Sequence, residues 1–165
     1  KRMASILKVN TIQDATNSTT AMSIDSSGRV TTSTNRPAFM ARRTSTQSNG
    51  IVVFDTVMFN QGSHYDNSNG RFTAPIAGLY NFSFNVLGDN DGNDTYWTTS
   101  LFINGSDYCK VQNRTEDDND FGGSLSVIAT LSASDYVQVN NAAINVYGTS
   151  SATSNFTWFC GYLIG

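Results

Sequence analysis

Charged side chains are scarce in this sequence. Lys, Arg, Asp and Glu make up 14% of its 165 residues, against about 25% in an average soluble domain. Asn, Ser and Thr take their place, so the sequence predicts a neutral surface that forms hydrogen bonds rather than ion pairs. The net charge of −3 leaves no basic patch that could release counterions from a nucleic-acid backbone. Nucleic acid is therefore not an expected partner.

Long apolar runs are also missing. No run reaches the roughly 20 residues that a membrane span needs, so we expect no membrane insertion. The first residues lack the apolar core of about 7 to 15 residues that marks a secretory signal, and we expect a chain that is not exported by that route. Met3 reads as a natural start, with Lys1 and Arg2 added before it.

Cysteine and histidine are too few for most site chemistry. Cys109 and Cys160 are the two cysteines and His64 is the one histidine, which excludes a zinc site on ligand number. We interpret the cysteines as reduced, apolar fillers rather than as a disulfide. His64 lies in the turn-like stretch "NQGSHYDNSNG", which favours a solvated loop histidine over the base of a Ser-His-Asp triad. The sequence predicts no catalytic residue.

Aromatic residues are absent from residues 3–36. This segment consists mostly of Ser, Thr and Asn with short apolar runs, and it cannot bury a core alone. Ile6, Leu7, Val9 and Ile12, and then "MSIDSSGRV" with its glycine turn, are typical of short strands. We expect the segment to become ordered by pairing with other copies of itself, or by docking on a larger assembly.

From Pro37 onward, apolar residues recur with a period of two between Gly and Asn turns, and no window has a helical repeat. This pattern is typical of an all-β sandwich. Asn104-Gly105 is the strongest hairpin signal, because both residues tolerate the positive φ of a type I′ turn. The expected strands are "AFMARR", "IVVFDTVMF", "LYNFSFNVL", "YWTTSLFI", "YCKVQ", "SLSVIATL", "YVQVNNAAINVY" and "NFTWFCGYLI".

The last of these strands is apolar on both faces. One face carries Phe156, Trp158, Cys160, Tyr162 and Ile164, and the other carries Thr157, Phe159, Gly161 and Leu163. Such a strand needs cover on both sides, and another copy of the chain is the simplest cover for the second side. We predict a homo-oligomer. The predicted trimer-interface residues are Phe39, Tyr80, Phe82, Phe159 and Tyr162.

One stretch also carries a family resemblance. Residues 54–84, "FDTVMFNQGSHYDNSNGRFTAPIAGLYNFSF", resemble the signature of the globular head domain of complement component C1q. The resemblance resumes at Asn104-Gly105, at "SLSVIATLSASDYVQV" and at the terminal "FCGYLIG", so it covers residues 37–165. It implies a ten-stranded jelly roll of the tumour necrosis factor type that forms homotrimers. Two features depart from the family: a Gly-X-Y collagen stalk is missing, and Ser134 stands where glycine usually precedes Asp135.

The N-terminal segment has a second resemblance. "SILKVNTIQDATNSTTAMSIDSSGRV" is similar to the N-terminal segments of structural proteins of tailed bacteriophages, particularly those of marine cyanobacteria. This implies a non-enzymatic virion protein, made in the host cytoplasm and displayed on the particle. Two roles stay open: a fibre tip that adheres to a host-surface glycan or protein, and a capsid decoration or cement protein. The alternatives are a secreted C1q-like or tumour-necrosis-factor-like ligand or lectin, and a surface-polysaccharide depolymerase.

Carboxylates cluster in "GDNDGND" and "TEDDND". Closely spaced carboxylates suit calcium, which some complement-type heads hold, but Gly92 comes too early for an EF-hand loop. We favour two solvated loops over an ion site, and we expect no other cofactor. A glycosidase would also need a substrate cleft that two short loops do not make. The calcium candidates are Asp89, Asp91 and Asp94, or Asp117, Asp118 and Asp120.

Residues in or near these loops are also the candidates for meeting a host surface. Neutral amides, carboxylates and exposed aromatic rings are groups that can bind sugars or proteins. The predicted host-contact residues are Asp91, Asn93, Tyr96, Asn113 and Asp118.

Overall fold

The structure is a computed structural model that describes residues 8–16, 18, 20–32, 36–89, 96–114, 121–151 and 153–165. The chain forms two compact units, Lys1–Arg36 and Pro37–Gly165. Every regular element in the described residues is a strand. Within the same ranges, no helix has the length and apolar character needed to cross a membrane.

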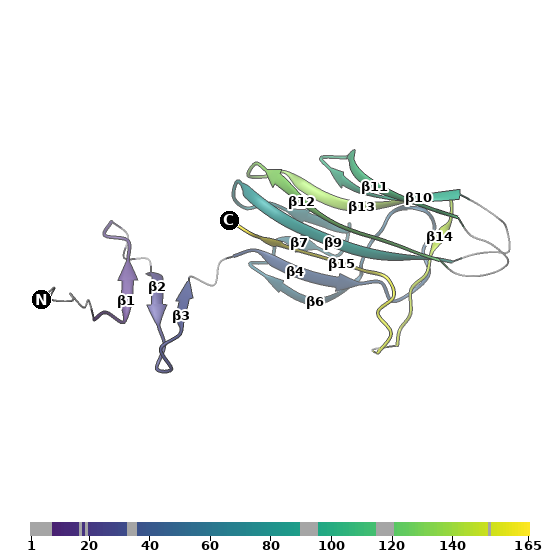
Figure 1. Cartoon of the computed structure of the whole chain (residues 1–165). Coiled ribbons are helices and arrows are strands. Elements are labelled where there is room, and N and C mark those ends of the chain that lie inside the picture. The colour runs from purple at the N-terminus through teal and green to yellow at the C-terminus, as the bar shows by residue number, and fades with distance from the viewer. Residues whose placement is uncertain are drawn as a thin grey trace, which may run out of the picture. The chain divides into compact units, whose positions relative to one another are not determined.

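The first unit is a three-stranded antiparallel sheet. Its strands, drawn in purple and blue in Figure 1, follow one another as β1 (Thr11–Gln13), β2 (Thr20–Ile24) and β3 (Val30–Thr32). The β2–β3 turn is built by Asp25, whose Oδ1 accepts hydrogen bonds of 2.9 Å from the backbone N–H groups of Ser27 and Arg29. Gly28 completes this turn at φ +76°. A short polar sequence thus encodes its own turn.

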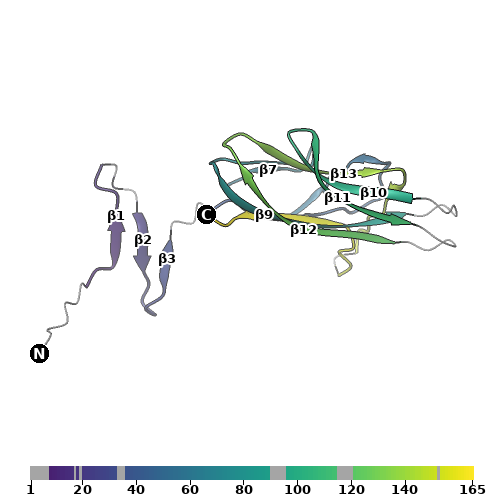
Figure 2. The same cartoon turned by 45° about the horizontal axis from the view of Figure 1, so that its top comes forward.

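The second unit, the head, is a sandwich of two six-stranded antiparallel sheets. The β15 sheet has the order β12-β9-β15-β4-β6, with β14 paired to β9, and the β13 sheet has the order β11-β10-β13-β8-β7, with β5 paired to β13. Figures 1 and 2 show them as two layers. The head strands are β4 (Ala38–Arg42), β5 (Gly50–Ile51), β6 (Thr56–Gln61), β7 (Tyr65–Asp66), β8 (Arg71–Thr73), β9 (Gly78–Asp89), β10 (Tyr96–Ile103), β11 (Ser106–Arg114), β12 (Gly122–Leu131), β13 (Tyr136–Ala142), β14 (Asn145–Val146) and β15 (Trp158–Leu163).

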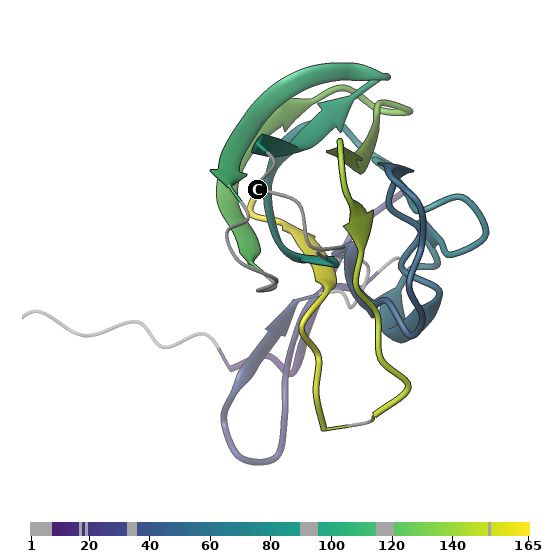
Figure 3. The same ribbon diagram turned by 90° about the vertical axis from the view of Figure 1, so that its right-hand side faces the viewer.

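The predicted all-β sandwich is confirmed. The described part of the head has twelve strands rather than ten, because β5 and β14, of two residues each, pair with the sheets off their main paths. The predicted strand "IVVFDTVMF" is divided between β5 and β6, which lie in different sheets. In Figure 3, seen nearly along the strands, the sheets curve around a common core.

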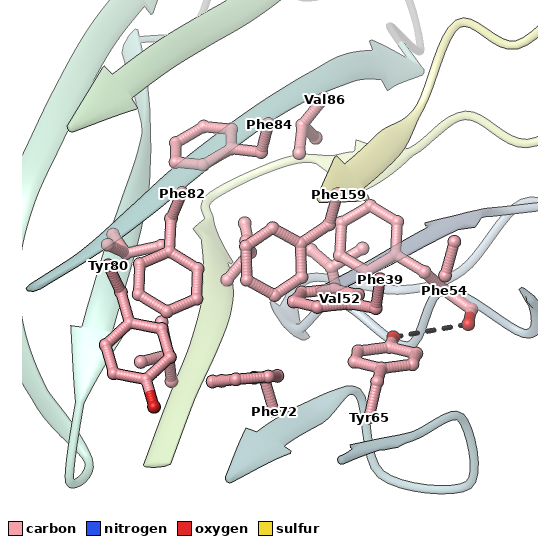
Figure 4. Close-up of a cluster of buried hydrophobic side chains, with 14 of the residues drawn as sticks. Phe39, Val52, Phe54, Tyr65, Phe72, Tyr80, Phe82, Phe84, Val86 and Phe159 are labelled. Atoms are coloured by element: carbon pink, nitrogen blue, oxygen red, sulfur yellow. Dashed lines mark hydrogen bonds between the residues drawn. The ribbon is translucent and has the colours of Figure 1, made fainter. Parts of the chain in front are cut away.

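Aromatic rings fill the space between the sheets (Figure 4). Phe39 of β4 stacks on Tyr65, with ring centroids 4.6 Å apart, and meets Phe159 of β15 edge-on at 4.9 Å. The Tyr65 hydroxyl donates a 3.2 Å hydrogen bond to the carbonyl oxygen of Phe54. Burial raises the pKa of Tyr65 above its ordinary value, because the phenolate would lose its hydration. The core therefore draws its rings from both sheets.

Two turns depend on positive φ angles. Asn104 and Gly105, at φ +52° and +79°, form the predicted tight turn between β10 and β11. Gly70 precedes β8 at φ +70°, and a Cβ atom there would lie 2.4 Å from the backbone oxygen of Val52. Glycine is required at residue 70 for both its conformation and its lack of a side chain.

Candidate functional site

The outward face of the β15 sheet carries a continuous group of apolar side chains. In the middle row, Cys160 of β15 lies opposite Met40 of β4, which lies opposite Phe59 of β6. In the next row, Tyr162 lies between Ala38 of β4 and Asn81 of β9. We call this surface the β15 face. Its other outward members on the same strands are Leu79, Ser83, Asn85, Ser124, Ser126, Ile128 and Trp158, followed along the chain by Ile164.

Large parts of these side chains remain exposed on the single chain. Phe59 is 51% exposed, Tyr162 50% and Ile128 52%. Phe156, which precedes β15, is 49% exposed and stacks edge-on with Tyr147. Single exposed apolar residues are ordinary, but a group of them across neighbouring strands is typical of an interaction site.

The β15 face carries few charged residues. Its five strands contain two charged residues, Arg42 and Asp89, and each lies at the end of its strand. Arg42 is also engaged within the chain, because its Nη1 donates hydrogen bonds of 3.1 Å to the carbonyl oxygens of Thr149 and Ser151. Covering this face with another protein would therefore bury few charges, and the desolvation cost would be small.

A polar strip lies beside the apolar group, where β9 meets β12. The Ser83 and Ser126 hydroxyls are 2.8 Å apart and hydrogen-bonded. Asn85 accepts a hydrogen bond from the Ser124 hydroxyl and donates one to the Phe156 carbonyl oxygen. These hydrogen bonds satisfy the polar groups within the chain, so the strip can be covered without leaving them unpaired.

Cys160 lies in the middle of the β15 face. Burial raises the pKa of its thiol, and a backbone hydrogen bond with Ser83 opposes that shift only in part. The thiol is therefore protonated at neutral pH and behaves as a small apolar group. Both cysteines are free thiols, as the sequence predicts.

The outward face of the β13 sheet is different in character. Lys110 pairs with Asp107 at 3.2 Å, and Gln138 donates a 2.9 Å hydrogen bond to the Asn69 carbonyl oxygen. The guanidinium of Arg71 lies 3.8 Å from the centre of the Tyr136 ring. The β13 sheet thus presents charged groups on its outward face, whereas the β15 face presents large apolar groups beside an uncharged polar strip.

Four of the five predicted interface residues are wrong. Phe39, Tyr80, Phe82 and Phe159 are at most 1% exposed, because they point between the two sheets and form the core. Tyr162, on the opposite side of β15, is half exposed and is the one predicted residue that the structure brings to the surface. The alternation along β15 is as predicted, but the predicted interface set combines Phe159 and Tyr162, which lie on opposite faces of that strand.

Sequence reasoning missed several members of the β15 face. Phe59 lies in the predicted strand "IVVFDTVMF", whose alternation does not show that it is exposed. A register shift in the pairing of β6 with β4, at Met40/Ala41, leaves both Met58 and Phe59 exposed. Ile128 of β12 lies on the same face as Ser124 and Ser126, and these serines are the signal that could have marked that face as the outward one. Trp158 was not missed, because the alternation of the last strand puts it on the same face as Tyr162.

Few of the predicted calcium and host-contact residues are described. Asp89 ends β9, whereas Asp91, Asn93, Asp94, Asp117, Asp118 and Asp120 lie outside the described residues. Within the described ranges, no group of three His, Cys, Asp or Glu side chains could hold a metal ion. Tyr96 is 65% exposed, and the Arg114 guanidinium on the neighbouring strand lies 5.5 Å from its ring centre. Asn113 is half-buried opposite Trp97.

Comparison with known proteins agrees with this architecture. The family model described as "C1q domain" matches residues 38–164. A relative from Mus musculus, the A-type polypeptide of the complement C1q subcomponent, is 40% identical over 72 residues, which cover 43% of this chain and 26% of the mouse protein. The chain thus matches about a quarter of that relative's length.

Solved structures share the fold at low identity. The globular domain of zebrafish complement 1qA superposes with a TM-score of 0.62 at 18% identity, covering 79% of this chain and 98% of that one. Murine APRIL has a TM-score of 0.63 at 11% identity, with 78% and 99% covered. Eiger TNF from S. frugiperda has a TM-score of 0.62 at 9% identity, with 79% and 94% covered. With its jelly-roll sandwich and a family match across residues 38–164, the chain belongs to the C1q domain family.

Proposed function

We propose that this chain is a non-enzymatic structural protein of a tailed bacteriophage, whose C1q-like head forms a homotrimer and binds the host surface. The observation that carries the proposal is the β15 face, an apolar and nearly uncharged surface on one side of a sandwich whose other side is polar. A trimer would bury the β15 face and leave the β13 sheet and the ends of the head in contact with solvent. The family resemblance supports three copies rather than two.

The virion role is supported by the N-terminal segment. Its resemblance to segments of phage structural proteins, and its position before the head, suit a part that attaches the head to a particle. In this proposal the protein is made in the host cytoplasm and displayed on the virion. A fibre tip that contacts a host glycan or protein is the leading role, and a capsid decoration protein is the second.

Electron microscopy of intact particles tests this role. Antibodies raised against the full chain should label the ends of fibres if the head is an adhesin. Label spread over the capsid would replace the fibre role with decoration. Particles that carry no label, although the protein is made during infection, would refute the virion proposal.

A secreted ligand is the alternative from another class. The match to the mouse complement C1q polypeptide favours it. A gene that encodes a signal peptide or collagen repeat before the head, or a place among animal genes, would support the secreted ligand over the virion protein.

Binding rather than catalysis is the proposed chemistry of the head. C1q-type domains are generally non-enzymatic, and His64 lies on the surface turn after β6 with its ring beside Gly62. Loss of polysaccharide viscosity on incubation with the protein, abolished by Asp→Asn changes in the acidic loops, would contradict this. We propose that no cofactor is needed, so calcium should give no heat in a calorimetric titration and no change in Tm.

A further inference from the structure

The N-terminal sheet gathers its large apolar side chains on one face. Ile12 lies opposite Met22 in one row, and Ile24 lies opposite Val30 in the next row of the same face. The other face carries Thr11 opposite Ser23. A strand presents alternate residues to alternate faces, so the pairing register gathers all four apolar residues on one side.

Local turn chemistry fixes that register. The Asp25 carboxylate accepts two backbone hydrogen bonds across the β2–β3 turn and pairs with Arg29 at 2.7 Å. Before β2, Asp14 Oδ1 accepts a 2.9 Å hydrogen bond from the Thr16 N–H, and the Asp14 carbonyl accepts one of 3.0 Å from Ser18. A plain linker needs no defined register, whereas a surface that must match a partner does.

The apolar face lacks a core of its own. Ile12 is 49% exposed, Ile24 41% and Val30 59%, and every described residue of β1 is exposed. A sheet of three short strands becomes independently stable when its hydrophobic face is covered. The apolar face of the N-terminal sheet therefore needs a partner whose contacting surface is apolar and uncharged.

We propose that this partner is the same face of two other copies, so that three N-terminal sheets pack around one axis as a three-sided prism. The inference rests on the proposed homotrimeric head. The chain between Thr32 of β3 and Ala38 of β4 can span at most about 20 Å, and β4 belongs to the sheet that bears the β15 face. A trimer of heads would therefore hold three N-terminal sheets at a high effective concentration.

Cysteine cross-linking of the full chain tests the prism. Met22 and Ser23 are neighbours on the central strand β2 and lie on opposite faces, so they form a matched pair. Under mild oxidation, Met22→Cys should give a disulfide between two copies at residue 22, leaving one chain in three unlinked. Ser23→Cys should give little or none. Peptide mapping separates these links from any made by Cys109 or Cys160.

The outcomes separate this inference from the trimer. Residue-22 links that form at least ten times faster than residue-23 links would support the prism. Equal or absent links in a protein that sediments as a trimer would overturn the prism and leave the head trimer standing. A monomer without links would overturn both. Hydrogen exchange on the unmodified chain gives a second reading: β2 amides that exchange as freely as an unfolded peptide would also overturn the prism.

Discussion

Replacing Tyr162 by Asp should convert the proposed trimer into folded monomers. Tyr162 is 50% exposed on the single chain, so an interface would cover about 100 Å² of its side chain, worth about 2.5 kcal/mol per copy. Losing this burial free energy in all three copies comes to about 7.5 kcal/mol, which lowers the trimer association constant by roughly five powers of ten. An unpaired carboxylate on an apolar surface adds a further cost of desolvation.

Two matched variants isolate the effect. Phe159→Asp places the same charge on the other face of β15, where the side chain is fully buried against Phe39 and Phe54. It should cost more than about 5 kcal/mol and unfold the head. Gln112→Asp places the charge on an exposed position of β11 in the β13 sheet and should change neither mass nor Tm appreciably.

Light scattering coupled to gel filtration, with circular dichroism, provides the assay. The expected pattern is a folded monomer for Tyr162→Asp, an unfolded chain for Phe159→Asp and an unchanged trimer for Gln112→Asp. A Tyr162→Asp protein that remains a trimer of unchanged Tm would refute the assignment of the β15 face.

Three further predictions concern turns of the head. Ser134 adopts φ +74°, so Ser134→Gly should relieve left-handed strain and raise stability by roughly 0.5 kcal/mol; a lower Tm would contradict this. Gly70→Ala should cost at least about 2 kcal/mol in urea unfolding, because its Cβ would meet the Val52 carbonyl, and an unchanged midpoint would contradict this. Hydrogen bonds from the Asn104 side chain and, to a lesser extent, from the backbone N–H of Ser132 lower the pKa of Asp135. The stability that these hydrogen bonds give is fully present above the unfolded pKa of about 3.9 and is lost as the pH falls through the pKa of the folded protein. Asp135→Asn should therefore make Tm fall less steeply as the pH is lowered.

The strands and the tight turn could be predicted because their signals are local. The alternation of Tyr80, Phe82 and Phe84 with polar residues places one side of β9 inside, and all three are buried. Asn104-Gly105 forms its turn from the conformational freedom of two residues alone. In each case neighbours along the chain are sufficient to set the structure.

The break between β5 and β6 could not be read from the same pattern. Val52 and Phe54 continue the alternation and are fully buried, although the chain there crosses from one sheet to the other. The crossing is held by groups outside this stretch: Gln47 Oε1 accepts a 3.0 Å hydrogen bond from the Val53 N–H, and Arg43 donates one of 2.8 Å to the Val53 carbonyl oxygen. Periodicity reports which side chains are buried, not which sheet the backbone joins.

The membership of the β15 face could be predicted only in part for a related reason. β15 is apolar on both faces, and the sequence shows that both need cover without showing which face the core takes. The side of β15 that carries Phe159 faces the core, where its ring meets Tyr65 of the opposite sheet, and the side that carries Tyr162 is left outside. Phe59 lies on the same outward face as Tyr162 because of a register shift in the pairing of β4 with β6. That pairing is a tertiary contact.

Sedimentation equilibrium of the unmodified chain at low micromolar concentration tests the central claim, that the β15 face is covered by other copies of the chain. The account predicts a single species of three times the 17.9 kDa chain mass that persists on tenfold dilution. A well-folded species of 17.9 kDa at every concentration would contradict it.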